Sequence, residues 1–177
     1  MDYLERMLAD HLDQILRLGA ATLAGMIVGL NRDLEGKPTG VRTLGLVGLG
    51  TALVTVASLE YASLADHPDA LSRVVQGLIQ GILTGIGFIG AGAILRDREN
   101  RDIQGLTTAA SVWVTAAAGM VCGLGNWPLV IIGVVMALGL LVMGHGAEKV
   151  VGGLLERLRL RKPSKREGSP AEGASEE

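Results

Sequence analysis

Residues 106–145 read LTTAASVWVTAAAGMVCGLGNWPLVIIGVVMALGLLVMGH and contain no Asp, Glu, Lys or Arg. A bilayer core about 30 Å thick needs roughly 20 mostly apolar residues per helix. The stretch is long enough for two such helices, at 106–124 and 129–145. Trp127-Pro128 marks the start of the second, because proline fits the first turn of a helix. The sequence therefore predicts a helical hairpin that crosses a membrane twice.

Three more apolar stretches precede this hairpin, at 15–30, 44–62 and 74–95. The chain is 49% hydrophobic but only 3% aromatic, and its Leu, Val, Ile, Ala and Gly residues form long blocks. Such blocks suit lipid better than the one-sided stripes of a water-soluble helix. We expect an all-α fold, a polytopic membrane bundle of five transmembrane helices over residues 15–146.

The basic residues indicate how this bundle is oriented. Thirteen of the 16 Lys and Arg residues fall in the loop after the first span, the loop after the third span, or the C-terminal segment. Only Arg6, Arg17 and Arg73 fall on the other side. The positive-inside rule places the N-terminus outside and the C-terminus in the cytoplasm, with Tyr61 and Trp127 at the outer interface.

The segments that flank the bundle differ from it in composition. Residues 1–14 lack the basic start and the cleavage site of a secretory signal, and Leu4, Leu8 and Leu12 predict an amphipathic helix on the outer surface. Residues 147–162 predict a basic amphipathic helix on the cytoplasmic leaflet. Residues 163–177 are rich in Ser, Gly, Pro, Lys and Glu, and predict a disordered tail.

Rows of small residues predict how the helices pack, because helices in lipid associate through close backbone approach. The third span has Gly77, Gly81 and Gly85 at four-residue spacing, and the fourth span has a similar row. We expect these two helices at the centre of the bundle. Gln76 and Gln80 must either bond across the bundle or face a wet pocket, since an unpaired amide in hydrocarbon is costly.

Three motifs in order carry a resemblance to a known family. The loop has Arg32-Asp33, Gly36-Lys37-Pro38 and Gly40-Val41-Arg42-Thr43 before LVGLGTAL; GIGFIGAGAIL lies at 85–95, and Gly105-Leu106-Thr107-Thr108-Ala109-Ala110-Ser111 precedes Trp113. Over residues 20–126 the chain resembles the MgtC/SapB family of bacterial inner-membrane proteins. Asn31 and Leu44 depart from the family pattern. With only residues 147–177 after the last span, the chain looks like the short, SapB-like form without a C-terminal cytoplasmic domain.

The resemblance and the small-residue rows together define the candidate site residues. The candidate functional loop comprises Arg32, Asp33, Lys37, Arg42 and Thr43. The candidate intramembrane pocket or packing surface comprises Gln76, Gly77, Gln80, Gly81, Thr84, Gly85, Gly87, Gly90, Gly92, Gly105, Thr107, Thr108 and Ser111.

The resemblance implies a role in adaptation to low magnesium and, in pathogens, in survival inside host cells. For the MgtC branch it implies restraint of the F-type ATP synthase. We expect no enzyme, cofactor or metal site: His11, His67 and His145 are scattered, and Cys122 stands alone. The favoured hypothesis is a non-catalytic regulator that contacts the lipid bilayer and another membrane protein or itself, and no nucleic acid. The alternative is a transporter or channel for Mg²⁺ or another small solute.

Overall fold

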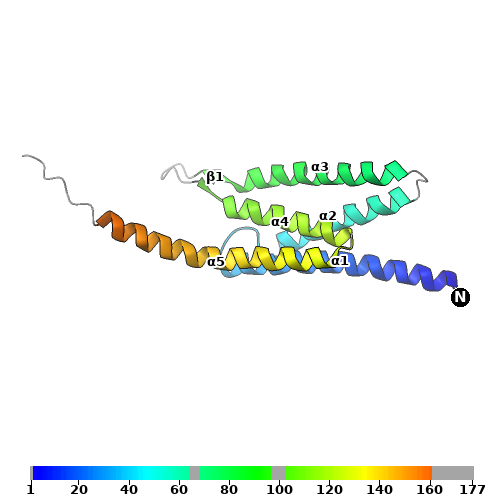
Figure 1. Ribbon diagram of the computed structural model, residues 1–177, viewed down its shortest axis with the longest axis horizontal. Coiled ribbons are helices and arrows are strands. Elements are labelled where there is room, and N and C mark those ends of the chain that lie inside the picture. Colours follow the sequence, from blue (N-terminus) through cyan, green and yellow to red (C-terminus); the bar gives the residue numbers. More distant parts are fainter. Residues whose placement is uncertain (1, 64–67, 97–102, 161–177) are drawn as a thin grey trace, which may run out of the picture. The chain divides into compact units, whose positions relative to one another are not determined.

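The structure is a computed structural model that describes residues 2–63, 68–96 and 103–160. The all-α prediction is confirmed, with a single two-stranded hairpin among these residues. In chain order the elements are α1 (Asp2–Leu34), α2 (Val41–Ser63), α3 (Pro68–Ala93), β1 (Leu95–Arg96), β2 (Ile103–Gln104), α4 (Leu106–Gly123) and α5 (Trp127–Leu160) (Figure 1).

The described residues contain five helices that are long and apolar enough to cross a membrane, as the sequence predicts. Their apolar portions are 7–34, 41–61, 71–93, 106–123 and 127–144. The chain falls into two compact units, one up to Leu141 and one from Val142 onwards. The packing described below is that of the first unit.

The predicted helices at both ends of the chain are not separate. α1 runs without a break from Asp2 into the first span, because no Gly or Pro interrupts the sequence before Gly19. α5 likewise continues from the fifth span to Leu160, and the next proline is Pro163. The predicted disordered tail, 163–177, lies outside the described residues.

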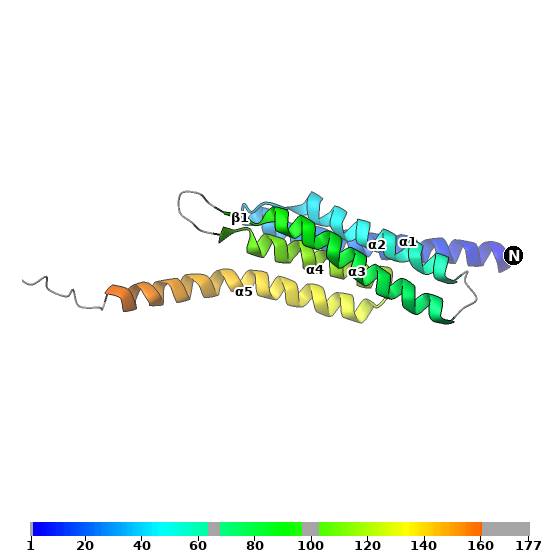
Figure 2. The ribbon, with the colours of Figure 1, turned by 90° about the horizontal axis from the view of Figure 1, so that it is seen from above.

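Helices α1, α2 and α4 pack closely against one another through small residues, and all run along a common direction with α3 (Figure 2). Gly25 of α1 faces the α2 backbone, where an added Cβ would lie 2.8 Å from the carbonyl carbon of Leu44. Gly119 of α4 faces Gly48 of α2, where an added Cβ would lie 2.5 Å from the carbonyl oxygen. Bulkier side chains would hold these helices apart.

Two apolar clusters fill the interior of this packing. One is formed by Val28, Leu44, Ile86, Val112 and Ala116, and the other by Ala21, Ala52, Cys122 and Val130. Because the clusters draw on all five helices, the apolar faces of α3 and of the first part of α5 also pack against the three-helix core.

The prediction that α3 and α4 share the centre is half wrong. α4 is central, with 50% of its span buried, whereas only 11% of the α3 span is buried. α3 turns Leu78, Ile82, Ile86 and Gly90 toward the bundle, at the four-residue spacing of one helix face. Gly77, Gly81 and Gly85 lie elsewhere on the helix. A Cβ added at any of them would have no neighbouring atom within 4 Å.

One end of the bundle, here called the loop end, carries the α1–α2 connection and the strands β1 and β2. β1 pairs antiparallel with β2, with Leu95 opposite Gln104 and Arg96 opposite Ile103. Gly105 follows with φ of 87° and starts α4. An added Cβ at Gly105 would fall on the carbonyl oxygen of Ala93, so only glycine fits both the dihedral angle and the space.

Candidate functional site

A buried arginine joins three parts of the chain at the loop end. Arg32 lies in the last turn of α1 and is only 2% exposed. Its Nη2 donates a hydrogen bond to the Thr108 hydroxyl in the first turn of α4, at 2.5 Å, and its Nη1 lies 3.8 Å from the Glu35 carboxylate. A charge-assisted hydrogen bond of this kind is roughly twice as strong as a neutral one. Arg32 therefore fixes the start of α4 against the end of α1.

The same cluster retains unused hydrogen-bonding capacity. Arg32 Nε and Asn31 Oδ1 are both buried without a hydrogen-bond partner in the described part of the chain. Since a buried unpaired polar atom costs about 1–3 kcal/mol, these two atoms make the cluster a functional candidate as well as a structural one. Asn31 is also one of the two departures from the family pattern.

The loop that follows is held by the Asp33 carboxylate. Asp33 Oδ2 accepts a hydrogen bond of 2.9 Å from the backbone N–H of Val41, at the start of α2. This bond satisfies one of the N–H groups that a helix start leaves unpaired. Gly40 lies so close to Asp33 that an added Cβ would overlap the carboxylate. Glycine at position 40 therefore leaves the room that the Asp33 carboxylate needs to reach the start of α2.

The candidate loop residues thus separate into two groups. Arg32 and Asp33 form the fixed contacts just described, whereas Lys37, Arg42 and Thr43 are exposed. The exposed group is placed to meet water, lipid headgroups or a partner.

Part of the candidate intramembrane surface is indeed internal. Thr108 and Ser111 are buried, and the Ser111 hydroxyl donates to the Thr107 carbonyl at 2.8 Å. Gly90 is buried against Ala109, at 3.6 Å from the position of an added Cβ. Gly90 and Ala109 thus form part of the contact between α3 and the start of α4.

The rest of that surface points away from the bundle. The exposed members are Gln76, Gly77, Gln80, Gly81, Thr84, Gly85, Gly87 and Gly92 on α3, together with Thr107 on α4. Gly77, Gln80, Gly81 and Thr84 share one side of the helix at three- and four-residue spacing, opposite the side that carries the buried Leu78 and Ile86. We call these four residues the exposed α3 face. The prediction that Gln76 and Gln80 bond across the bundle or face a wet pocket within it is wrong for a single copy of the chain.

This exposed α3 face is poorly suited to lipid. Gln80 lies two residues from the middle of the apolar portion 71–93, or about 3 Å along the helix axis. Neither Gln76 nor Gln80 forms a side-chain hydrogen bond within the described part of the chain. An amide in hydrocarbon without such a bond costs about 4–8 kcal/mol relative to water, or about 1–3 kcal/mol judged from protein mutants.

The exposed side of α5 provides the contrast. It consists of large aliphatic side chains, among them Ile131, Ile132, Val135, Met136 and Leu140. That composition suits a surface covered by acyl chains. The two peripheral helices of the same unit therefore present different surfaces, one typical of lipid contact and one typical of contact between helices.

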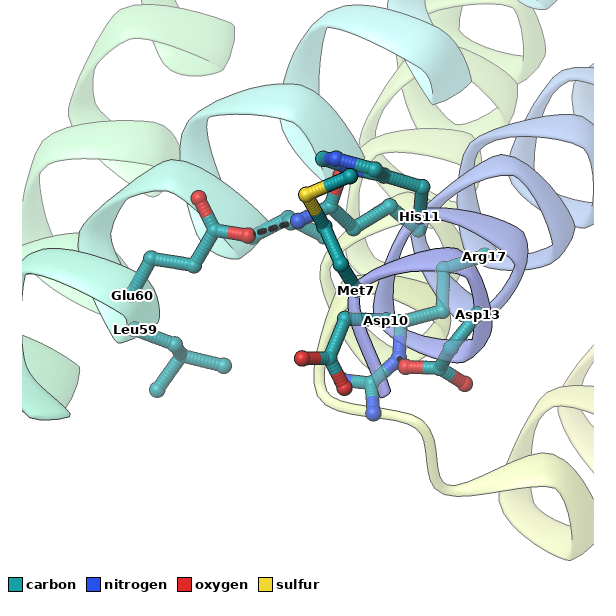
Figure 3. A pocket seen from close by; sticks show the side chains of 9 residues that line it. Met7, Asp10, His11, Asp13, Arg17, Leu59 and Glu60 are labelled. Carbon is teal, nitrogen blue, oxygen red and sulfur yellow. Dashed lines mark hydrogen bonds and ion pairs between the residues drawn. The ribbon is translucent and has the colours of Figure 1, made fainter. Parts of the chain in front are cut away.

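Opposite the loop end, a hollow of about 440 Å³ lies between the first turns of α1 and the end of α2. Figure 3 shows Asp10, Asp13 and Arg17 on one wall and Glu60 on the other. The Gln14 amide donates to Glu60, and Arg17 Nη1 donates to the Gly123 carbonyl at the end of α4, at 2.8 Å. These bonds tie α1 to α2 and α4.

Three carboxylates and one arginine line this hollow, and they do not form a metal site. Arg17 Nε lies 2.7 Å from Asp13 Oδ2, in a pair that is partly open to solvent. Among the described residues, no three His, Cys, Asp or Glu side chains come together in a way that could hold a metal ion. The sequence indicated only that Arg17 flanks a span. Its bond to Gly123, 106 residues away, had no local signal.

Five apolar spans, three of them packed together through glycine and tied by an arginine at each end, define a multi-pass helical membrane protein. The model of the MgtC family matches residues 18–150, three quarters of the chain, and the chain belongs to this family. The family resemblance found in the motifs is thus confirmed. No solved structure matches the chain.

The similar proteins are bacterial. Protein SrpB of Synechococcus elongatus is 41% identical over 130 residues, 70% of each chain. The putative magnesium transporter YhiD of Escherichia coli is 42% identical over 131 residues, 74% of this chain and 60% of YhiD. Protein MgtC of Salmonella typhimurium is 37% identical over 123 residues, 70% of this chain and 48% of MgtC. The chain thus spans about half the length of MgtC and about three fifths of YhiD. The apolar helices and these relatives place it in a bacterial inner membrane.

Proposed function

We propose that this chain is a non-catalytic membrane protein that acts by binding the transmembrane helices of another membrane protein or of itself. The exposed α3 face is the observation that carries the proposal. The face combines glycines that have open space beside them with an unpaired amide near mid-span. Lipid offers the amide no hydrogen-bond partner, whereas a second helix can pack closely against the glycines and bond to the amide. The rigid contacts of Arg32 and Asp33 hold α1, α2 and α4 as the frame that presents this surface.

The physiological setting follows from the family. The resemblance to MgtC implies adaptation to low magnesium and, in a pathogen, survival inside a host. The F-type ATP synthase is the candidate complex that the chain regulates. The family match over residues 18–150 covers this chain's own five apolar spans, so we assign the binding role to the bundle.

We also propose that the loop end faces the cytoplasm. Support comes from the basic residues, because Arg32, Lys37 and Arg42 all lie at the loop end, in the last turn of α1, the following loop and the first turn of α2. In a variant in which Cys122 is replaced by Ala, Lys37→Cys should react with an impermeant maleimide only after the inner membrane is opened. Labelling of the Lys37→Cys variant in sealed spheroplasts would contradict this orientation.

The experiment that tests the binding role is site-specific photo-crosslinking in native membranes. A photoreactive residue at Thr84, on the exposed α3 face, should yield a discrete protein adduct. The matched control is Val135, an apolar position on α5 that is 63% exposed, and it should yield none. If both positions give no adduct, or both give the same unspecific smear, the binding role is wrong.

A second function is supported by a row of buried hydroxyl groups. Thr108, Ser111 and Thr115 of α4, with Thr51 and Thr55 of α2, run along the inside of the bundle. The related YhiD carries the name of a putative magnesium transporter. Against transport, the hydroxyls of Thr51, Thr55 and Ser111 are already bonded to carbonyls of their own helices.

Flux through proteoliposomes separates the two functions. If the chain transports Mg²⁺, purified protein should move the ion at a rate above empty vesicles, and Thr115→Val should lower that rate. Thr115 is the informative position because its hydroxyl is buried without a partner among the described residues. A rate equal to that of empty vesicles would eliminate transport and leave the binding role standing.

A further inference from the structure

We infer that the exposed α3 face binds a second copy of this chain, so that two α3 helices cross in a symmetric dimer. This inference rests on the proposed function, since it names the occupant of the same surface. It is carried by the amide chemistry of Gln80, the glycines beside it and the contrast with α5.

The amide of Gln80 is complementary to itself. A glutamine side chain carries two N–H donors and one carbonyl acceptor. Two copies in one membrane have the same orientation, so a two-fold axis along the membrane normal brings each residue near its own counterpart. In such an isologous contact, each Gln80 can donate to the other and accept from it. A single surface thereby satisfies both amides, with no second protein required.

The shape of the face allows the approach that these bonds need. At Gly77 and Gly81 nothing lies within 4 Å of an added Cβ, and the two residues lie one helical turn apart. Paired glycines at this spacing let two membrane helices cross at close range, at about −40°. Thr84 continues the same side for another turn and adds a hydroxyl to the contact.

The crossing geometry also keeps the two positive charges at the ends of the paired helices apart. Arg73 lies near the outer end of the apolar portion 71–93 and is exposed. Helices that cross near Gln80 and Gly81 diverge away from that point, which separates the two Arg73 side chains and leaves both in water. Toward the other end of the helix, one turn beyond Thr84 on the same side, Phe88 is 84% exposed. It covers the crossing on the side of the loop end.

Disulfide trapping in native membranes tests the dimer. Cys122 is the only cysteine, so a Cys122→Ala background allows one new thiol at a time. Gly81→Cys should oxidise to a covalent dimer of twice the 18.4 kDa chain. Val135→Cys on α5, with 63% exposure, is the control and should stay monomeric. Equal trapping at both positions would mean random collision and would overturn the inference.

The amide contribution needs a separate measurement, because trapping reports only proximity. In fluorescence energy transfer between labelled copies in liposomes, Gln80→Leu should weaken association about tenfold, which corresponds to about 1.4 kcal/mol. Gln80→Asn, which keeps an amide, should lose less. If Gln80→Leu associates as the parent does, the amide does not hold the dimer and the inference fails.

The outcomes also separate this inference from the proposed function. If Gly81→Cys stays monomeric while the photoreactive residue at Thr84 captures a different protein, the surface binds another partner. The proposed function then stands and the dimer does not. If neither position captures any protein, both are wrong.

Discussion

The sharpest test of the bundle is a single methyl group at Gly25. With the backbone unchanged, the new Cβ of Gly25→Ala would lie 2.8 Å from the carbonyl carbon of Leu44 and 3.1 Å from Cα of Gly45, and closer still to the Leu44 oxygen. Real Cβ atoms essentially never come within 3.0 Å of such neighbours. Because all three of these atoms belong to the backbone, no side-chain rotation relieves the contact, and α1 must move away from α2.

The expected size of the effect follows from this geometry. Overpacking of a well-packed interior costs about 1–3 kcal/mol. In proteins of 150–250 residues, 1 kcal/mol shifts the melting temperature by about 2–4 °C. Gly25→Ala should therefore lower the melting temperature by about 2–12 °C.

The chain carries its own reporter for this measurement. Cys122 is its only cysteine and is fully buried, against Ala21, Ala52 and Val130. A maleimide that fluoresces on reaction should label Cys122 only as the bundle opens on heating in detergent. The reading therefore reports loss of the core itself.

Gly85→Ala is the matched control, and its expected shift has the opposite sign. Gly85 has nothing within 4 Å of an added Cβ, so the methyl group meets no neighbour. Alanine is better than glycine in a helix by about 0.5–1 kcal/mol, which should raise the melting temperature by about 1–4 °C. A fall for Gly85→Ala, or an unchanged value for Gly25→Ala, would refute this account of which glycines are internal.

Three further predictions use the same thermal assay. Thr108→Val removes the acceptor of the buried arginine and should cost about 1.5–3 kcal/mol, whereas Thr107→Val, at an exposed neighbour, should stay within about 0.5 kcal/mol; equal effects would contradict the hydrogen bond. Asp33→Ala removes the carboxylate that caps α2 and should cost about 0.5–2 kcal/mol of stability. Asp33→Asn keeps an acceptor oxygen and should lose less. Gly105→Ala forces φ of 87° on a residue with a Cβ and should destabilise by more than about 1 kcal/mol, while Gly92→Ala, in open space, should not.

The sequence was sufficient for the spans and for much of the internal packing. Charge-free apolar length fixes a span because each crossing needs about 20 residues, and the five predicted spans match those of the structure. Small residues of α1, α2 and α4 also lie at helix contacts, as Gly25, Gly48 and Gly119 show. In these helices the small residues and the buried apolar residues lie on the same, inward side.

The orientation of α3 could not be obtained in this way. In a water-soluble protein the apolar side of a helix points inward, but in a membrane the lipid is as apolar as the interior. Leu78 and Ile82 suit either environment, so hydropathy does not say which side of α3 meets the bundle. The rule that small residues mark a helix contact still applies to Gly77 and Gly81, but the contact it indicates lies outside the single chain.

The long-range hydrogen bonds of the two arginines could not be predicted from the sequence, for a different reason. Arg32 and Thr108 are 76 residues apart, and Arg17 and Gly123 are 106 apart. Each residue has an unremarkable local role, as a loop charge, a helix start or a flank of a span. Only the fold shows that one arginine at each end of the bundle reaches across to α4.

These two ties divide the molecule into parts with separable roles. Arg17 and Arg32 hold α4 to α1 at its two ends, and the glycine contacts between them leave α1, α2 and α4 no room to shift. α3 joins this frame through one apolar face, and the frame contributes nothing to the opposite face. Changes at Gly25 or Thr108 should therefore lower stability whether or not a partner is present. Changes at Gln80 or Gly81 should alter association without lowering the melting temperature of a single copy. A variant of the exposed α3 face that lowers both equally in dilute detergent would show that the frame depends on that face, and the division between frame and binding surface would then be wrong.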